Sequence, residues 1–342
     1  MPYLAAGWHA PIVPRPALDG TPSSVPAPTS LPGNVASTYF NMAVRNDSPS
    51  PSPYLPGFVH VDGIYSAWVT WGAFARLGVS RIRLTGGEPL LRRNISELSR
   101  RIADLPGIED LSLSTNATQL DKHAHALKAA GVTRLNVSLD SLQQARVEKI
   151  NGRDVLAKVM DGLTVAQAVG FAPIKLNMVA LRGTNDDEID EMVAFCMERG
   201  FVLRLIEAMP MGSTGRNAEY MDLQPVKERL RAQFNLIETT FPGAGPARYL
   251  GSSDGRFNVG FITPVSQHFC QTCNRVRIAV DGTAYMCLGQ DEKFEFRPLL
   301  RGGCSDAELE TAILHSINLK PERHEFNEAP HKILRFMSMT GG

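Results

Sequence analysis

Short apolar runs alternate with helix-forming segments along the middle of the chain. The runs with strand character are 81–85, 111–115, 134–139, 174–181 and 203–209. Between them lie segments such as ISELSRRIADL and DEIDEMVAFCMERG, in which apolar residues recur at helical spacing. One helix between successive strands predicts βα units and a parallel sheet. At least five such units in series favour a barrel or partial barrel over a short doubly wound sheet.

The pattern changes on both sides of this region. Twelve of the 23 prolines precede residue 57 and no apolar period is visible there, so residues 1–57 are predicted to be extended or disordered. After Pro210, the segments FNVGFITPV, VRIAV and AYMCL look like strands without intervening helices, which indicates a smaller α+β region. The expected organisation is a Pro/Ser-rich segment over 1–70, a barrel over 71–215 and a C-terminal region over 216–342.

Composition narrows the class of protein. The chain has 342 residues, with 35 basic and 35 acidic side chains, so a net charge of zero gives no global attraction to nucleic acid or anionic membrane. No run approaches the roughly 20 apolar residues of a membrane-spanning helix, and the first residues lack the basic and apolar stretches of a secretory signal. Five cysteines do not make a disulfide scaffold in so long a chain. We therefore expect a cytoplasmic protein.

Polar side chains gather where the predicted strands end, as expected for a site at the mouth of a barrel. The first strand runs into TGGEPLLR, where Gly86 and Gly87 allow the backbone to approach a ligand and Glu88 adds a carboxylate. An ordinary βα turn with a capping acid is the alternative interpretation. The other strands carry Ser114, Thr115 and Asn116, then Asn136, Ser138 and Asp140, then Lys175 and Asn177, and finally Arg204 and Glu207. With Arg83, the basic members would give the cavity a positive field suited to phosphates.

A second signal is the cysteine pattern HFCQTCNRVRIAVDGTAYMCL. Cys270 and Cys273 form CxxC, and Cys287 follows across a hairpin predicted at Asp281–Gly282, so three thiolates can meet at a metal or an iron–sulfur cluster. A structural zinc with His268, an inert buried set and a redox pair remain as alternatives. Two nearby arginines, Arg275 and Arg277, favour an anionic ligand such as a nucleotide. Cys196 and Cys304 are interpreted as ordinary thiols.

From about residue 73 to its end, the chain resembles the molybdenum-cofactor biosynthesis protein A family, the GTP 3′,8-cyclases of the radical S-adenosylmethionine superfamily. The resemblance rests on RIRLTGGEPLLR, LSLSTNATQL, RLNVSLDSL, KLNMVALRGTNDDEI, RLIEAMPMG, FCQTCNRVRIAVDG and the terminal GG. It implies a partial (βα)6-type TIM barrel, the radical SAM core, followed by a C-terminal α+β region with a second cluster site.

The resemblance also implies the chemistry. A first [4Fe-4S] cluster bound to S-adenosylmethionine donates an electron, and the resulting 5′-deoxyadenosyl radical takes hydrogen from the ribose of GTP. The ribose carbon then attacks C8 of guanine, which gives (8S)-3′,8-cyclo-7,8-dihydroguanosine 5′-triphosphate. A second cluster leaves one iron free to hold the purine. The expected partners are GTP, S-adenosylmethionine and a downstream cyclic pyranopterin monophosphate synthase, and a homodimer is left open.

Carried over motif by motif, the resemblance gives each group of residues a role. S-adenosylmethionine would contact Gly87, Ser138 and Met209. GTP would contact Arg83, Ser114, Lys175 and the segment Arg275, Val276 and Arg277. Cys270, Cys273 and Cys287 would hold the second cluster. Arg275, Arg277, Gly341 and Gly342 would act in catalysis, the last two as a tail that enters beside bound substrate because glycine is slim enough.

One part of the family pattern has no counterpart. The first cluster needs a CxxxCxxC loop near residues 36–46, where this chain reads VASTYFNMAVR, and the first cysteine of the sequence is Cys196. Serine and proline do not replace thiolates as iron ligands, so the chain as written is expected not to generate the radical. A degenerate paralogue and a wrong reading frame or misassembled gene over residues 1 to about 70 are the two interpretations, and the abrupt change of composition favours the second.

Three hypotheses follow for function. The chain is a GTP 3′,8-cyclase with an artefactual or inactivating N-terminal defect, a non-catalytic protein that binds GTP and an iron–sulfur cluster, or a zinc-stabilised domain without the chemistry. Iron with acid-labile sulfide would exclude the third hypothesis, and turnover of GTP would separate the first from the second.

Overall fold

The computed structural model describes residues 39–44, 67–242 and 245–340, and every strand in these ranges belongs to one sheet. The strand order is β12-β11-β10-β1-β2-β3-β4-β5-β6-β9-β8-β7. The central strands, all parallel, are β1 (Tyr39–Val44), β2 (Arg81–Gly86), β3 (Asp110–Thr115), β4 (Arg134–Ser138), β5 (Ile174–Ala180) and β6 (Val202–Glu207). Because the order has two ends, the barrel is partial, as predicted.

The C-terminal strands extend both edges of this sheet. On one side β9 (Asn258–Ile262) pairs parallel with β6, followed by antiparallel β8 (Arg248–Gly251) and β7 (Ile237–Thr239). On the other side β10 (Val276–Ile278) pairs parallel with β1, followed by antiparallel β11 (Thr283–Tyr285) and β12 (Lys293–Glu295). The predicted hairpin at Asp281–Gly282 therefore joins β10 to β11. The predicted strand AYMCL ends at Tyr285, so Cys287 lies in the loop that follows.

Strand β1 was not predicted. It lies in the Pro/Ser-rich part of the sequence, yet its register places Asn41 opposite Arg83 of β2 and Arg277 of β10. It therefore joins the barrel strands to the strand that follows the CxxC motif. The other residues of the 1–70 segment, apart from the start of the first described helix, lie outside the described ranges.

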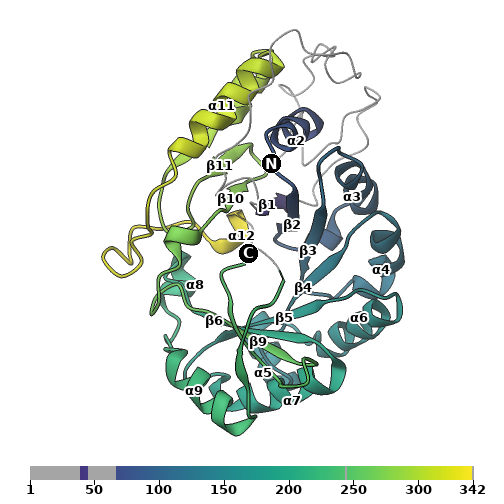
Figure 1. Cartoon of the computed structure of the whole chain (residues 1–342), viewed down its shortest axis with the longest axis vertical. Helices are drawn as coiled ribbons and strands as arrows, with labels where there is room; N and C mark the ends of the chain where they lie inside the picture. Colours follow the sequence, from purple (N-terminus) through teal and green to yellow (C-terminus); the bar gives the residue numbers. More distant parts are fainter. Residues whose placement is uncertain (1–38, 45–66, 243–244, 341–342) are drawn as a thin grey trace.

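Helices cover the outer side of the parallel strands (Figure 1). They are α2 (Ala67–Arg76), α3 (Ile95–Ala103), α4 (Leu120–Ala129), α5 (Gln144–Asn151), α6 (Leu156–Ala168), α7 (Ile189–Arg199) and α9 (Gln224–Gln233). The short α8 (Gly212–Arg216) packs instead against the C-terminal segment, where Arg216 donates to the carbonyl of Ile333 at 3.0 Å. Helix α7 is an example of a helix with one buried face, since Ile189, Met192, Val193 and Cys196 are buried at helical spacing. It ends at Gly200, whose φ of 68° allows the left-handed C-terminal turn.

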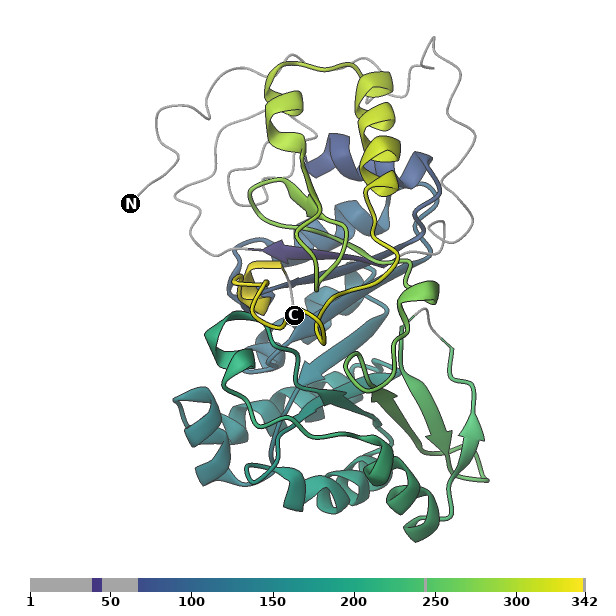
Figure 2. The same cartoon turned by 90° about the vertical axis from the view of Figure 1, so that its left-hand side faces the viewer.

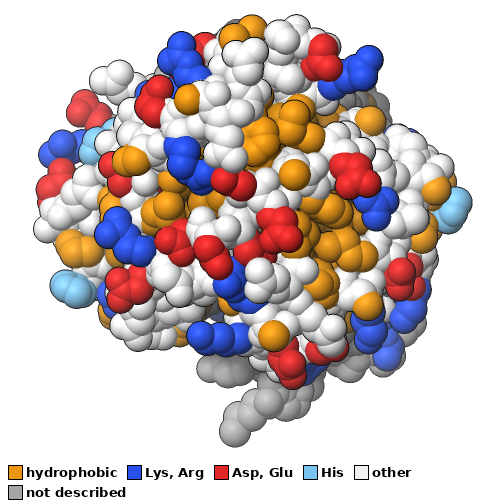
Figure 3. Space-filling model, turned by 90° about the horizontal axis from the view of Figure 1, so that it is seen from below, with side chains coloured by type: hydrophobic (Ala, Val, Ile, Leu, Met, Phe, Trp, Pro, Cys, Tyr) orange, Lys and Arg blue, Asp and Glu red, His pale blue; other side chains and the backbone are white. Residues whose placement is uncertain are grey.

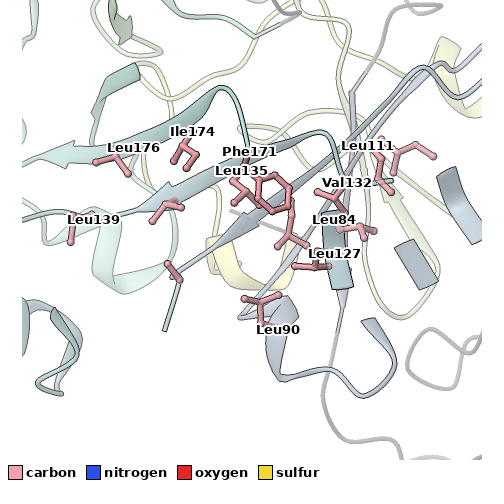
Figure 4. Close-up of a cluster of buried hydrophobic side chains, with 14 of the residues drawn as sticks. Leu84, Leu90, Leu111, Leu127, Val132, Leu135, Leu139, Phe171, Ile174 and Leu176 are labelled. Atoms are coloured by element: carbon pink, nitrogen blue, oxygen red, sulfur yellow. The ribbon is translucent and has the colours of Figure 1, made fainter. Parts of the chain in front are cut away.

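The core lies between the strands and these helices. Along β2, Ile82 and Leu84 are buried in the core, whereas Arg83 between them belongs to the opposite face of the sheet. Figure 4 shows the same outer layer on the four neighbouring strands β2 to β5, with Leu84, Leu111, Leu135 and Leu176 labelled. Because Leu and Ile side chains of these strands supply the core from the outer face, the inner face is able to carry polar groups.

The C-terminal helices pack near the start of the barrel. They are α10 (Phe296–Arg301), α11 (Asp306–Asn318) and the short α12 (Met337–Thr340), and α10 and α11 stand together at one end of the molecule (Figure 2). The guanidinium of Arg76 in α2 contacts Glu310 of α11 at 2.6 Å. The last helix, α12, contacts β1 and β2, so the described chain ends beside the barrel strands.

The surface is mixed in charge. Seen from below, acidic and basic side chains are interspersed with apolar ones (Figure 3), as in the contact of Arg229 on α9 with Asp190 on α7. Among the described helices, none combines the length and the apolar character that crossing a membrane requires.

We predict that Gly162→Ala destabilises the protein. A Cβ at this position of α6 would lie 2.5 Å from the carbonyl oxygen of Ala117 and 3.1 Å from the Cβ of Leu120. Overpacking of this kind costs about 1–3 kcal/mol, which outweighs the gain of up to about 1 kcal/mol in helix propensity. Urea unfolding measures the change. The control is Gly72→Ala in α2, whose Cβ would meet only the end of Arg76 at 3.4 Å, so equal stability losses in both variants would contradict the packing argument.

Candidate functional site

A polar inner face runs across five neighbouring strands. The register pairs on this face are Arg83 with Ser112, Ser112 with Arg134, Ser114 with Asn136, Asn136 with Lys175, Ser138 with Asn177, and Asn177 with Arg204. Side chains at alternate positions point to one face of a strand. The predicted convergence of polar strand residues on one interior is therefore confirmed for these positions.

The first cavity, which we call the basic cavity, lies toward the amino ends of the strands. It measures about 460 Å³. It is lined by Arg83, Arg134, Lys175 and Arg204 from the parallel strands and by residues 238–242, 245 and 247–249 from β7, β8 and the loop between them. Sequence analysis placed the functional residues at the opposite, carboxyl ends. The difference arises because Arg83, Lys175 and Arg204 occupy the second or third position of their strands, close to the amino ends.

Lys175 is the most perturbed cation of the basic cavity. Burial, together with the positive charges of Arg204, Arg134 and Arg83, lowers the pKa of Lys175 from 10.5 to about 7. Its ammonium lies 4.6 Å from the ring centre of Phe241, a partial compensation through the π face. Five basic side chains, Arg248 included, line this cavity beside one carboxylate, Glu238, so its net positive charge suits an anion.

Two of the arginines are held by side chains of other strands. Arg134 contacts the carboxylate of Asp110 on β3, with its Nε donating to Oδ1 at 3.0 Å. Arg204 donates to the side-chain oxygen of Asn136, whose amide in turn donates to the carbonyl of Leu113 at 3.3 Å. The guanidinium groups are thus held in place along the strand face, and binding an anion there requires little ordering of side chains.

The second cavity, the cysteine cavity, lies at the carboxyl ends of the strands. It measures about 100 Å³, and its lining includes Cys270, Cys273, Cys287, Arg275, Arg277 and Met209. Cys270 begins the 3-10 turn η4 (Cys270–Thr272), and the backbone N–H of Cys273 donates to the carbonyl of Cys270 at 3.0 Å. The structure therefore brings the three predicted cysteine ligands to one cavity, beside the two predicted arginines.

The positive charges near the cysteine thiols favour the thiolate form, which is the form that binds a metal or a cluster. Burial by itself raises the pKa of Cys273, but Arg275 and Lys320 outweigh it and bring that pKa down to about 7. Burial raises the pKa of Cys287. The Arg275 Nη2 lies 3.7 Å from the sulfur of Cys273. Since thiolates rather than thiols bind metals, Cys273 is prepared for ligation at neutral pH.

Among the described residues, several buried side-chain polar atoms have no hydrogen-bond partner, and two of them belong to predicted residues of the site. One is Nε of Arg277, where burial and the nearby Arg275 lower the guanidinium pKa to about 10. The other is the side-chain oxygen of Asn177, which lies in register with Ser138 on the strand face. Unpaired buried polar atoms are rare in folded proteins, and a bound ligand is a physical reason to keep them.

Lys320 stabilises the hairpin that lines the cysteine cavity. Its ammonium donates to the carbonyl of Arg275 at 2.8 Å and to the carbonyl of Met286 at 2.7 Å. It thereby ties together the two sides of the β10–β11 hairpin that carry Arg275 and Cys287. Sequence analysis did not single out Lys320, because nothing in the segment INLKPE indicates this long-range contact.

The carboxylate of Glu207 organises the approach to the cysteines. This fully buried side chain at the end of β6 accepts the backbone N–H groups of Val265 and Ser266, both at 3.0 Å, and the Ser266 hydroxyl. Tyr220 donates a further hydrogen bond at 3.3 Å. Since residues 265–266 lead directly into the CxxC loop, Glu207 fixes the loop that positions Cys270.

Two other acids of the strand ends have structural roles. Glu88 accepts from the Thr115 hydroxyl and the Asn116 N–H, both at 2.7 Å, and caps η2 (Pro89–Leu91) through the Leu90 N–H. The capping interpretation of GGEP is thus correct for Glu88. Asp140 accepts the N–H of Val179 at 2.8 Å, and burial raises the Asp140 pKa to about 6.

The remaining predicted residues divide into four groups. Gly87, with no atom within 4 Å of a Cβ built on it, and the exposed Ser138 leave room for a ligand near the carboxyl ends. Val276 is buried in the core, and Ser114 is half-buried on the inner face. Gly341 and Gly342 lie outside the described residues. Cys196 and Cys304 are buried away from the cysteine cavity, as expected for ordinary thiols.

Several lining residues were not predicted. In the basic cavity they are Arg134, Arg248, Phe241 and Tyr249, and in the cysteine cavity they are Lys320, Arg323 and His324. Arg134 was detectable, because it opens the strand that carries Asn136. The others lie in connections far from any motif, and only the folded chain brings them to the cavities.

Two family models match the chain. Residues 68–196 match the radical SAM superfamily, and residues 201–326 match the family described as Molybdenum Cofactor Synthesis C. Together they cover the barrel strands β2–β6, the basic cavity and the cysteine cavity.

Curated relatives match most of the chain. A GTP 3′,8-cyclase of Ectopseudomonas mendocina (strain ymp) is 43% identical over 275 residues, which are 79% of this chain and 83% of the relative. One of Pseudomonas putida (strain W619) is 45% identical, with 79% and 82% covered. One of Rhizobium etli (strain CIAT 652) is 44% identical over 278 residues, with 79% and 80% covered.

A solved structure shares the fold. The crystal structure of Streptococcus suis SuiB bound to S-adenosylmethionine aligns with a TM-score of 0.52 at 15% identity, covering 89% of this chain and 77% of that one. At this identity the likeness concerns the fold alone.

We predict that Glu207→Gln lowers the free energy of unfolding. The amide nitrogen would face donors that now meet an ionised oxygen, and a hydrogen bond to a charged group contributes about 1.5–3 kcal/mol. Urea unfolding measures the loss. The matched control is Glu97→Gln on α3, whose exposed carboxylate pairs with Arg100 and Arg101 and should change stability by less than about 1 kcal/mol. A Glu207→Gln protein as stable as the control would show that the loop is held in another way.

Proposed function

Because the chain belongs to the GTP 3′,8-cyclase family of the radical S-adenosylmethionine superfamily, an enzyme family of molybdenum cofactor biosynthesis, we propose that it binds GTP along the inner face of the barrel. The triphosphate occupies the basic cavity and the guanine occupies the cysteine cavity. The observation that carries this proposal is the pair of cavities with matching chemistry at the two ends of one polar strand face.

The basic cavity suits the triphosphate. Its four strand cations outnumber the nearby carboxylates of Glu238 and Asp110, so a ligand of high negative charge fits there. Arg204 in this cavity and Met209 in the other are five residues apart on and beyond β6, which corresponds to about 16 Å of extended chain. That separation is comparable with the length of an extended nucleoside triphosphate, so one GTP reaches both cavities.

The cysteine cavity suits the guanine and a cluster. Three thiols line one cavity, one of them with a pKa near 7, and the unpaired Nε of Arg277 faces the same environment. Cys270, Cys273 and Cys287 would hold a [4Fe-4S] cluster, which when bound supplies an iron without a protein ligand for the purine. Arg275 and Arg277 donate to the guanine and its substituents, and Val276 contributes its backbone.

S-adenosylmethionine is assigned to the carboxyl ends of β2 and β4. The open space around Gly87, the exposed hydroxyl of Ser138 and the side chain of Met209 at the cysteine cavity support this placement. The unpaired oxygen of Asn177 beside Ser138 adds an acceptor for the amino group of that ligand. A catalytic role for Gly341 and Gly342, which lie outside the described residues, stays a prediction.

The residues present do not fit the family's first cluster. No cysteine precedes Cys196 in the sequence, and Cys196 is buried in α7. We therefore derive no step through that cluster and propose that the chain as written holds one cluster and produces no 5′-deoxyadenosyl radical. A non-catalytic paralogue that binds GTP and one cluster is the second candidate function. The downstream cyclic pyranopterin monophosphate synthase and a homodimer stay predictions.

Anaerobic reconstitution with iron and sulfide should give about four irons per chain, because only three cysteines share a cavity. Cys273→Ser should abolish iron binding, and Cys304→Ser, at a buried thiol outside the cavity, should leave it unchanged. Metal and sulfide analysis gives the answer. A content near eight irons would mean that the chain has a second set of ligands.

Arg275→Ala should weaken GTP binding by about 1.5–3 kcal/mol, the range for hydrogen bonds to charged groups. Isothermal titration with the reconstituted chain measures the affinity. Arg256→Ala is the control, because that side chain is 88% exposed and lies outside both cavities. Equal affinities of wild type and Arg275→Ala would remove Arg275 from the binding site.

GTP affinity should fall as pH rises from 7 to 9. The Lys175 ammonium loses its proton near pH 7 in the free chain, and a bound triphosphate stabilises the protonated form, so binding takes up a proton. The loss is at most about tenfold per pH unit. Lys175→Arg is the control, because arginine stays charged over this range. Any effect of the titration of GTP itself is the same for both proteins, so the difference between their profiles reports on Lys175. Parallel pH profiles for wild type and Lys175→Arg would place Lys175 away from the triphosphate.

A further inference from the structure

A compact set of metal-binding side chains lies at the edge of the cysteine cavity. The ligand atoms of His268, Cys270 and His324 all lie within 4.8 Å of one another. His268 comes from the loop after β9, Cys270 from η4 and His324 from the segment after α11. We propose that these three side chains form a mononuclear site for a divalent transition metal of the zinc type, and that this site competes with the second cluster for Cys270. The competition rests on the proposed cluster, whereas the metal site does not.

The spacing of the two histidines fits a single ion. Nδ1 of His268 and Nε2 of His324 are 3.4 Å apart. With zinc–nitrogen bonds of about 2.0–2.1 Å and tetrahedral angles, two imidazole nitrogens on one zinc are about 3.3 Å apart. The Cys270 sulfur is already within reach of both nitrogens, and a small rotation of its side chain completes the third bond. Two histidines and one cysteine form a common donor set for zinc and cobalt.

The cysteines are arranged differently. Among the described residues, Cys270, Cys273 and Cys287 line one cavity but do not form a group as compact as the His268 set. Ligands of separate irons in a cluster must be farther apart than ligands of one ion. Cys270 thus belongs to two ligand sets of different spacing, one for a cluster and one for a single ion.

The surroundings support a metal ion at this position. His324 is 4% exposed, and its ring lies between His268, with ring centres 4.9 Å apart, and Phe326, with ring centres 4.5 Å apart. His268 is exposed, so an ion reaches the site from solvent. Binding converts the Cys270 thiol to a thiolate and releases one proton, and no oxidant or reductant is needed.

An ion held here would withdraw Cys270 from the cluster. It would also connect the loop before η4 to the segment after α11, because His324 follows Lys320 by four residues. The site therefore occupies Cys270 before the cluster is assembled, and the ion has to leave before iron and sulfide can be accepted. This is a specific order of events, and it can be measured.

Cobalt is the probe for the test, because a cobalt–thiolate bond absorbs visibly and tetrahedral Co²⁺ has intense bands. The full chain is purified anaerobically with a chelator, and Co²⁺ is titrated into wild type, Cys273→Ser and His268→Gln. We expect one Co²⁺ per chain with a thiolate band in wild type and in Cys273→Ser. His268→Gln, at an exposed position, should bind at least about tenfold more weakly, and it should still take up iron and sulfide as the wild type does.

Zinc gives the second arm of the test. Wild-type chain loaded with one Zn²⁺ should assemble its cluster more slowly than metal-free chain, and His268→Gln should show no such delay. Absence of the cobalt–thiolate band in Cys273→Ser, or unchanged affinity in His268→Gln, would overturn the metal site. Equal assembly rates with and without zinc would overturn the competition. A wild-type chain that binds cobalt but never a cluster would refute the proposed cluster and leave the metal site standing.

Discussion

The buried carboxylate of Glu207 is the interaction that connects the two ends of the site. It closes β6 between Arg204, which lines the basic cavity, and Met209, which lines the cysteine cavity. Its oxygens accept the N–H groups of Val265 and Ser266, just before the CxxC loop. Removing one partner of such a buried network leaves polar groups unsatisfied, so the loop has one strongly preferred position. The distance between anion site and thiols is therefore set by a strand and one carboxylate.

Several positive charges are buried in the interior, and their burial lowers the stability of the fold. Burying Lys175 among Arg83, Arg134 and Arg204 costs stability, and the pKa of about 7 for Lys175 expresses that cost. The same holds for Arg277, whose pKa is lowered to about 10. An excess of positive over negative side chains at both cavities is typical of sites that bind anions, because the ligand supplies the balancing charge. The buried positive charges that lower stability are thus the same charges that would bind GTP.

Much of this could be predicted from the sequence, and the rest depends on contacts that local pattern does not encode. Periodicity predicted the βα strands, because each presents Leu or Ile to the helices and polar residues to the interior. The CxxC spacing and the hairpin residues predicted that the three cysteines meet at one place. Strand β1 was missed because proline and serine mask its surroundings. Lys320 and His324 were missed because they reach the cysteines from some 50 residues away in sequence. Closure of the basic cavity by Phe241 and Tyr249 was missed for the same reason.

The central claim is that one nucleotide spans both cavities. Hydrogen exchange of the reconstituted chain, with GTP and with inorganic tripolyphosphate, tests it most directly. The account predicts that GTP slows exchange around Arg275 and Cys287 and also around Thr239 and Tyr249, whereas tripolyphosphate protects only the second region. Protection by GTP confined to the cysteine cavity, with the basic cavity unchanged, would contradict the account.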